Sequence, residues 1–249
     1  MSARRTSTSP DSLGLSGNVV IESVADAEKL AEDTADRLRP HLPMIAAALA
    51  RCKEDSPCGL PICAVCSRSF RVKFIAQVMA LHRKQVGPHR FVTLFQREFE
   101  SGQLRSCDLR REQAVVRRRF DRLGFRGTTV VGGTEATWRS QSKRWILHLH
   151  LLAMGLDAAD IRSIRVRWSE QGPRFPVQAV LCAVDENLVS YLQKFSTYQR
   201  IGRQAVPLPV ERLVELARWS SRYKLADFPF IYGARREGRR LRALGGEDD

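Results

Sequence analysis

Two histidines, His148 and His150, have the types and the spacing most suited to chemistry in this chain. They lie in the apolar run 145–152, which is typical of a buried β-strand. Because side chains of a strand alternate between its faces, both imidazoles point the same way and the leucines between and beside them point the other way. Two buried imidazoles without partners are costly, and a shared metal ion removes that cost. The alternative is a purely structural pair with local hydrogen bonds.

A carboxylate is predicted to lie beside these imidazoles. If the strands 128–138 and 144–153 form a hairpin symmetric about the polar loop between them, Trp138 faces Trp145. The same register puts Glu135 directly opposite the first histidine, with Cβ atoms about 4.5–5.5 Å apart. A slip by one residue would turn the carboxylate to the other face.

Two imidazoles and a carboxylate form a donor set for a divalent ion that keeps open coordination positions. Such a set, here His148, His150 and Glu135, suits Mg²⁺ or Mn²⁺ acting on a substrate oxygen. Gly133 would lie opposite His150 in the same register and leave space above it.

Four of the six cysteines are crowded into residues 52–66, which indicates metal binding rather than a disulfide scaffold. The pattern C-x5-C-x4-C-x2-C suits a tetrahedral structural Zn²⁺ site, because four thiolates close the coordination shell. His41 is a weaker candidate for the fourth ligand. Cys107 and Cys182 stand alone and are expected to be small buried apolar residues. The proposed zinc ligands are Cys52, Cys58, Cys63 and Cys66.

The chain is strongly basic, with 41 Lys and Arg against 27 Asp and Glu and a formal net charge of +14. An excess of this size favours a polyanionic partner such as nucleic acid. One predicted helix, 108–123, has an arginine-rich face that could follow a DNA backbone, although a solvated surface is the commoner meaning of such a face. These arginines are Arg110, Arg111, Arg117, Arg118 and Arg122. No segment reaches the ~18 apolar residues of a membrane helix, so a cytoplasmic protein without a membrane partner is expected.

Hydrophobic periodicity predicts the elements that must position these residues. Helices are expected at 23–51 with a break between Pro40 and Pro43, and at 70–84, 108–123, 185–200 and 210–224. Strands are expected at 90–98, 128–138, 144–153 and 178–183, with a short helix and strand at 157–169. The basic tail from 233 onward is expected to be mobile.

These elements predict an α+β sandwich in four regions. The regions are a disordered basic tail (1–22), a helical region with the four-cysteine element (23–88), a catalytic core (89–205), and a C-terminal helix with a basic tail (206–249).

The segments Thr134–Trp138 (TEATW) and Trp145–Leu151 (WILHLHL) resemble the HUH endonucleases, and more narrowly the rolling-circle replication initiators of small bacterial plasmids. Phe91–Phe95 (FVTLF) resembles the first core strand of that family. The run Cys58–Cys66 resembles the cysteine motif that precedes this strand in the same subgroup. The resemblance covers about residues 52–200 and includes the order of the elements. Ile146 stands where the subgroup often has a further histidine.

The resemblance implies an HUH-type central antiparallel sheet flanked by helices, with Mg²⁺ or Mn²⁺ at the histidine pair. It also implies a tyrosine nucleophile on the helix at 185–200. Tyr191 would be that nucleophile and Lys194 its helper, although Phe195 replaces a second tyrosine of the family signature. Tyr198, two turns further on nearly the same face, is the alternative nucleophile. From its position in the apolar stripe alone, Tyr191 would be a packing residue.

The implied activity is nicking and rejoining of single-stranded or cruciform origin DNA through a 5′-phosphotyrosine intermediate. The implied partners are that DNA, a host helicase and a host polymerase. A transposase or relaxase with the same chemistry is a second possibility. A non-catalytic, zinc-dependent DNA-binding regulator is the alternative from another class.

Overall fold

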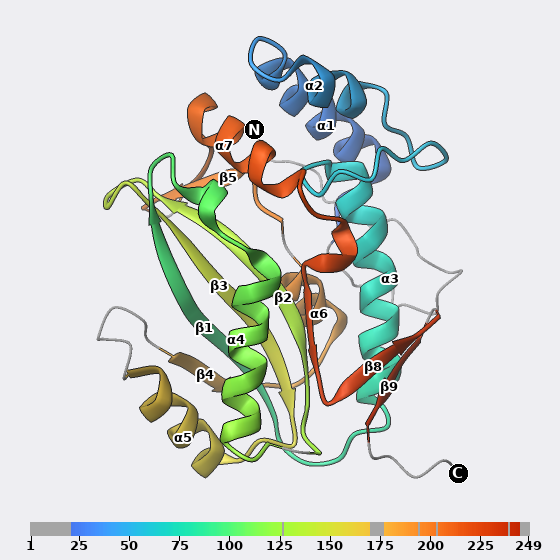
Figure 1. The fold of residues 1–249 in the computed structure, drawn as a ribbon. Coiled ribbons are helices and arrows are strands. Elements are labelled where there is room, and N and C mark those ends of the chain that lie inside the picture. The colour runs from blue at the N-terminus through green and yellow to red at the C-terminus, as the bar shows by residue number, and fades with distance from the viewer. Residues whose placement is uncertain are drawn as a thin grey trace.

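Five antiparallel strands form the central sheet, in the order β4–β1–β3–β2–β7 (Figure 1). The computed structural model describes residues 21–125, 127–169, 177–193, 195–202, 204–238 and 240–244. The strands of this sheet are β1 (His89–Glu100), β2 (Thr129–Arg139), β3 (Arg144–Met154), β4 (Val177–Leu181) and β7 (Pro229–Tyr232). The predicted α+β class with a central antiparallel sheet is confirmed.

The hairpin of β2 and β3 has the predicted register. Trp138 pairs with Trp145, and their rings meet edge to face with centroids 5.4 Å apart. The side chains of β3 are buried along almost its whole length, because the strand lies between two others with a layer of helices on each face.

Strand β1 pairs with the other edge of β3, which makes β3 the middle strand of the sheet. The register of this pair shifts between Phe95 and Arg97, so Gln96 forms a β-bulge. The Gln96 side chain is buried and its amide donates to Glu112 over 3.4 Å. Before the bulge Phe95 pairs with His148. After it, Arg97 pairs with Leu147, so the register is shifted by one residue to the end of the strand.

Helices α4 (Leu109–Arg122) and α5 (Ala158–Ser169) cover one face of the sheet, and α3 (Ala64–His82) and α6 (Glu186–Leu192) cover part of the other (Figure 1). Asp108 caps the start of α4, and its carboxylate accepts from two backbone amides of the first turn. The helix buries Val116 and Phe120 against Leu149 and Leu151 of β3. The even-numbered residues of β3, including both histidines, therefore face the α3 and α6 side.

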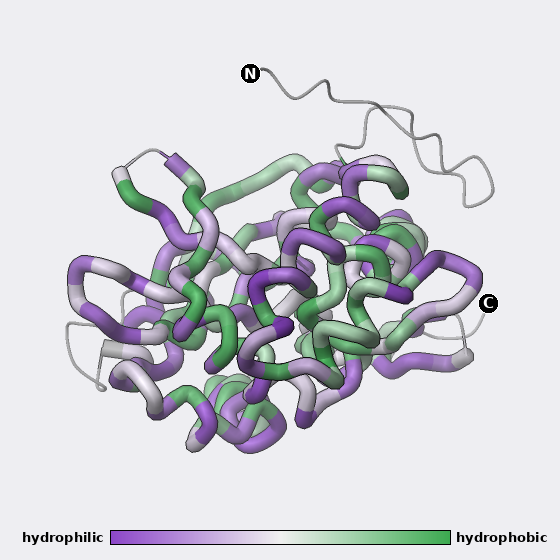
Figure 2. The backbone as a smooth tube through the Cα atoms, turned by 90° about the horizontal axis from the view of Figure 1, so that it is seen from above, coloured by the Kyte–Doolittle hydropathy of each residue, from purple (hydrophilic) through white to green (hydrophobic). Residues whose placement is uncertain are grey.

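Helices α1 (Val24–Leu38), α2 (Pro43–Ala50) and α7 (Val210–Ser220) pack at one end of the sheet around Trp145 and Trp219. Hydrophobic and hydrophilic stretches alternate along much of the chain, as expected for elements with one buried side (Figure 2). Helix α2 is an exception, because its sequence PMIAAALA has no charged residue. The break predicted between Pro40 and Pro43 separates α1 from α2, and Pro43 occupies the first position of α2.

Four predicted elements differ from the structure. Residues 158–169 form a single helix without a strand, and α3 begins at Ala64, six residues before the predicted helix. The helix predicted at 185–200 ends at Leu192. The tail predicted to be mobile forms a hairpin of β8 (Ala234–Glu237) and β9 (Arg240–Ala243), whose Leu241 is buried.

The remaining elements are short. Strands β5 (Tyr198–Ile201) and β6 (Gln204–Pro207) form a second small hairpin, and 3-10 turns lie at Leu104–Ser106 and Leu225–Asp227. Of the predicted N-terminal tail 1–22, residues 1–20 lie outside the described residues, whereas Ile21 is buried and Glu22 pairs with Arg71. Among the described residues, no helix combines the length and the apolar composition needed to cross a membrane.

Candidate functional site

Glu135, His148 and His150 meet on the face of the sheet that carries α6. Glu135 pairs with His148 across the hairpin, as predicted. The Nε2 atoms of the two histidines are 2.9 Å apart, and Glu135 Oε2 lies 3.1 Å from the first and 3.5 Å from the second. We call these three residues the candidate metal site.

The separations of the three donor atoms fit a divalent ion. Bonds of about 2.1 Å place neighbouring ligands of an octahedron about 3.0 Å apart. The separations of 2.9, 3.1 and 3.5 Å are close to that value and correspond to ligands on one side of an ion. All three donor atoms lie within 4.8 Å of one another. Two imidazoles and a carboxylate from two adjacent strands therefore form a donor set suited to a divalent ion.

Glu135 is ionised in this environment. Burial alone would raise the pKa of its carboxyl group, but hydrogen bonds and electrostatic attraction from His148 and His150 outweigh it and lower the pKa to about 2. The site therefore offers a negatively charged oxygen at neutral pH, the form that binds a metal ion.

Thr93 orients the second histidine. The Thr93 residue of β1 pairs with His150 of β3, and its Oγ1 lies 3.0 Å from His150 Nδ1. In the tautomer in which Nδ1–H donates to this hydroxyl, Nε2 carries a lone pair and can bind a metal ion. Sequence reasoning missed Thr93, because its role follows from the β1–β3 register, which joins segments 57 residues apart. His148 Nδ1 is buried and has no hydrogen-bond partner among the described residues.

Tyr191 lies next to the candidate metal site. Its ring centroid is 4.9 Å from that of His150 and 5.8 Å from that of Phe91. The side chain is 47% exposed, so Tyr191 is not the packing residue that its place in the apolar stripe suggested. Burial raises the pKa of the Tyr191 phenol, Glu135 raises it further, and Arg200 opposes them. The phenol therefore keeps its proton at neutral pH in the absence of a further positive charge.

The alternative nucleophile and the predicted helper are not on the helix of Tyr191. Helix α6 ends at Leu192, so Tyr198 lies in β5 and the prediction of two tyrosines on one helix face is wrong. Lys194 lies outside the described residues. Phe195, which was predicted to continue the helix, packs edge to face on Phe228 with centroids 5.4 Å apart.

Two glycines of β2 lie against the segment that ends α6. A Cβ atom at Gly133 would lie 2.0 Å from the carbonyl oxygen of Leu192. The space predicted above Gly133 is thus filled by the end of α6. The buried Gln193 amide donates to the Gly132 carbonyl over 2.6 Å and fixes the turn that ends the helix.

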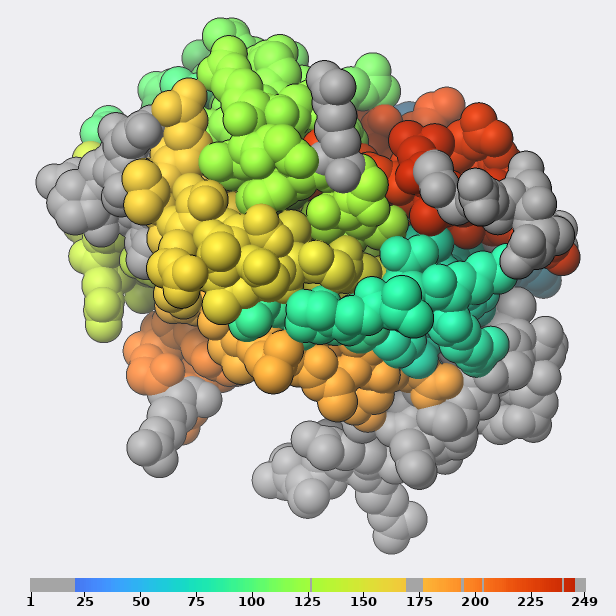
Figure 3. Space-filling view, turned by 90° about the horizontal axis from the view of Figure 1, so that it is seen from below, coloured from blue at the N-terminus to red at the C-terminus, as the bar shows by residue number. Residues whose placement is uncertain are grey.

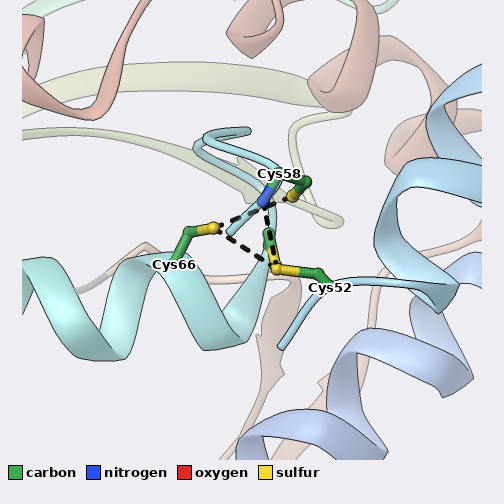
Figure 4. A group of neighbouring side chains, drawn as sticks. Cys52, Cys58 and Cys66 are labelled. Atoms are coloured by element: carbon green, nitrogen blue, oxygen red, sulfur yellow. Dashed lines mark hydrogen bonds between the residues drawn. The ribbon is translucent and has the colours of Figure 1, made fainter. Parts of the chain in front are cut away.

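The four predicted cysteines come together near the start of α3. Figure 4 shows three of them, Cys52, Cys58 and Cys66. Cys66 Sγ lies 3.5 Å from Cys52 Sγ and 3.7 Å from Cys58 Sγ, and all four sulfur atoms lie within 4.8 Å of one another. These distances exclude disulfides, whose sulfur atoms are about 2.05 Å apart. They fit a tetrahedral zinc ion, because Zn–S bonds of about 2.3 Å place the sulfur atoms about 3.8 Å apart.

Charge within the cysteine cluster is concentrated on Cys66. Hydrogen bonds from Cys58 and Cys63, together with the backbone amide of Gly59, lower the pKa of Cys66 to about 2. The effect on the partners is opposite: the pKa of Cys63 is raised, and that of Cys58 is raised to about 12. The cluster thus stabilises one thiolate without a bound ion. A thiolate is the form that binds a metal, so the cluster is a possible zinc site.

The remaining cysteines and His41 do not join this cluster. Cys52 completes the group of four, and the exposed His41 is not among its members. Cys107 is buried, as predicted, whereas Cys182 is half-buried.

The arginines of α4 lie on the other side of the sheet from the candidate metal site. Arg110 pairs with Asp227 over 3.1 Å, and Arg117 lies over the Phe230 ring while donating to the Ile231 carbonyl. Arg110 and Arg117 therefore make contacts within the protein. Arg111, Arg118 and Arg122 are exposed.

Comparison of the chain with models of protein families, with curated proteins and with solved structures gives no significant match. The function is therefore argued from the residues and their geometry.

Proposed function

We propose that the protein nicks and rejoins single-stranded DNA, with Tyr191 as the nucleophile and a divalent ion, Mg²⁺ or Mn²⁺, held by Glu135, His148 and His150. The observation that carries this proposal is the tyrosine ring 4.9 Å from the His150 ring, beside three converged donor atoms. The pattern of motifs, which resembles HUH endonucleases, supports the same chemistry. Within that family the proposed role is initiation of plasmid rolling-circle replication.

Each residue of the site has a defined task in this proposal. A divalent ion at the three ligands would supply polarisation of the scissile phosphate. Glu135 contributes negative charge to hold the ion, and Thr93 keeps His150 in the tautomer that binds through Nε2. Tyr191 is half exposed, so its phenol reaches a strand that lies on the surface.

The reaction is a transfer of one phosphodiester bond to tyrosine. The phenol oxygen of Tyr191 loses its proton and forms a bond to phosphorus, while the bond from phosphorus to the 3′ oxygen breaks. The leaving 3′ oxygen takes up a proton and becomes a free 3′-OH. A return attack by a 3′-OH reverses these steps and rejoins the strand. Lys194 is proposed, from the resemblance alone, to assist the tyrosine.

The cysteine cluster is proposed to hold a structural Zn²⁺. Its ligands come from the segment after α2 and from the first turn of α3, so the ion would join the N-terminal helices to the helix that covers α6. Four thiolates leave no open coordination position, so no catalytic step is assigned to it.

The cellular setting follows the resemblance. We propose a cytoplasmic initiator that acts on single-stranded or cruciform origin DNA and hands the open strand to a host helicase and polymerase. A transposase or relaxase would use the same site.

The test is incubation with labelled single-stranded DNA from the replicon of this chain plus Mn²⁺, analysed on a denaturing gel. We expect a protein-linked DNA band that Tyr191→Phe abolishes and that a chelator prevents. Tyr198→Phe is the matched control and should retain the band. Loss of the band in Tyr198→Phe with retention in Tyr191→Phe would move the nucleophile. Tight DNA binding without cleavage in any divalent metal would favour the non-catalytic, zinc-dependent regulator.

A further inference from the structure

The outer surface of α4 and α5 lies across the sheet from the candidate metal site. Leu149 and Leu151, which alternate with the two histidines along β3, pack under these helices. Phe120 of α4 contacts Trp168 of α5 with ring centroids 5.9 Å apart, so the two helices form one layer. Figure 3 shows α4 in green beside α5 in yellow, and the orange segment that contains α6 on the opposite side.

Three arginines form a stripe along the outside of α4. Arg111, Arg118 and Arg122 are spaced by seven and four residues, which places them on one side of a helix. All three are exposed, and the buried residues of the helix, such as Val116, face the sheet. At a rise of 1.5 Å per residue the stripe is about 16 Å long.

The charge of this stripe is not neutralised within the described part of the chain. None of the three arginines forms an ion pair with a described carboxylate, in contrast to Arg110, which pairs with Asp227. Helix α4 as a whole carries six arginines against Glu112 and Asp121. The Glu112 carboxylate is already engaged by Arg97 over 3.0 Å.

Helix α5 extends the basic surface. Arg162 and Arg165 are exposed on it. The acidic residues at its start, Asp157 and Asp160, are engaged with each other's backbone amides over 2.8–2.9 Å. Together with the three arginines of the α4 stripe, Arg162 and Arg165 give the two helices a cationic outer surface.

This surface lacks the side chains that bind unpaired bases. Single-stranded nucleic acid is held by aromatic rings on which its bases stack, in addition to basic groups. Among the described residues, Tyr191 is the one aromatic side chain that is largely exposed, and it lies on the other face of the sheet. Phe120, Phe125 and Trp168 of the α4–α5 layer are buried. The composition of this surface thus fits phosphate groups without exposed bases.

We propose that the outer surface of α4 and α5 binds the phosphate backbone of duplex DNA, while the candidate metal site on the other face takes a single strand. The identification of that duplex as the arm next to the nicked strand rests on the proposed function. Binding of the duplex itself does not, since it depends on charge alone.

The experiment measures binding of the full chain to a short fluorescent duplex by anisotropy over a range of salt concentrations. The test variant combines Arg111→Ala, Arg118→Ala and Arg122→Ala. Each phosphate contact contributes about 0.9 to the slope of log K against log salt, so the slope should fall by about 2.7. Between 50 and 200 mM salt the wild type should therefore lose about 40-fold more affinity than the variant.

A matched control removes three other exposed arginines, Arg39, Arg83 and Arg218, by the same substitution. It loses the same formal charge from other elements, so its salt slope should change by less than one. A second test variant, with lysine at the three α4 positions, keeps the charge and should keep the slope. It guards against misreading a folding defect as lost binding.

The results separate this inference from the proposed function. The α4 variant should still form the protein-linked band with a short single strand, whereas Tyr191→Phe should lose the band and keep duplex binding. An α4 variant with the same salt slope as the control would overturn the inference. So would an equal loss of affinity for duplex and single-stranded DNA.

Discussion

Thr93 gives the candidate metal site its orientation through a single hydroxyl group. A valine in its place keeps the shape and leaves His150 Nδ1 without an acceptor. We expect Thr93→Val to weaken Mn²⁺ binding about 10- to 100-fold, the usual cost of losing such a partner. Titration calorimetry measures the affinity.

Two further variants test whether this effect is specific. Thr93→Ser keeps the hydroxyl and should restore most of the affinity. Thr129→Val removes another buried hydroxyl of the same sheet, one that donates to the Gly233 carbonyl, and should leave Mn²⁺ binding unchanged. Equal affinities of Thr93→Val and wild type would show that another group orients His150.

At the scale of elements, the contact between α6 and β2 determines the position of Tyr191, the proposed nucleophile. A methyl group at Gly133 would meet the Leu192 carbonyl at 2.0 Å, so Gly133→Ala must displace the end of α6. We expect a loss of stability of about 1–3 kcal/mol, as for other overpacked sites, measured by urea unfolding. The covalent DNA band should decrease more than Mn²⁺ affinity does, since the three ligands do not lie on α6.

Gln193→Leu provides a comparison that removes the 2.6 Å hydrogen bond to Gly132 without adding bulk to the strand. It should also reduce the covalent band. If both variants form the band at the wild-type rate, the end of α6 has no part in placing the tyrosine.

The difference between local and long-range contacts explains which parts of the site could be predicted. The pairing of Glu135 with His148 needed only a short loop and two facing tryptophans, so the sequence was sufficient. The contact between Thr93 and His150 depends on a pairing of distant strands and on a bulge at Gln96. The end of α6 depends on a hydrogen bond from Gln193 to a strand 61 residues away. The hydrophobic pattern of a helix does not predict such a distant hydrogen-bond partner.

The same reasoning applies to the C-terminal hairpin. Its strands are rich in arginine, which suggested a solvated tail. In the structure Leu241 is buried with residues of α3, and this contact between distant segments orders the hairpin. The many arginines correctly indicated an exposed surface, but they gave no information on the pairing of β8 with β9.

At the scale of the whole molecule, the two candidate metal sites should differ in how firmly they hold their ions. The cysteine cluster offers four sulfur ligands, whereas the histidine site offers three donor atoms. We expect one Zn²⁺ per chain to survive dialysis against a chelator that removes the second ion. Native mass spectrometry measures both.

Cys58→Ser should lose that zinc and unfold at a lower temperature, by about 2–4 °C for each kcal/mol lost in a chain of this size. Cys182→Ser alters a half-buried cysteine outside the cluster and is the matched control. Retention of a full equivalent of zinc by Cys58→Ser would exclude the four-cysteine site.

The position of β3 at the centre of the sheet has a consequence for motion. A strand with neighbours on both sides opens only when much of the sheet opens, so His148 and His150 share the slowest fluctuations of the molecule. Helix α6 has only seven residues, among them the exposed Tyr191, and short elements open at a lower free-energy cost. We therefore expect Tyr191 to be able to move away from the site while the two imidazoles stay in place, so that a rigid part and a mobile part meet at one site.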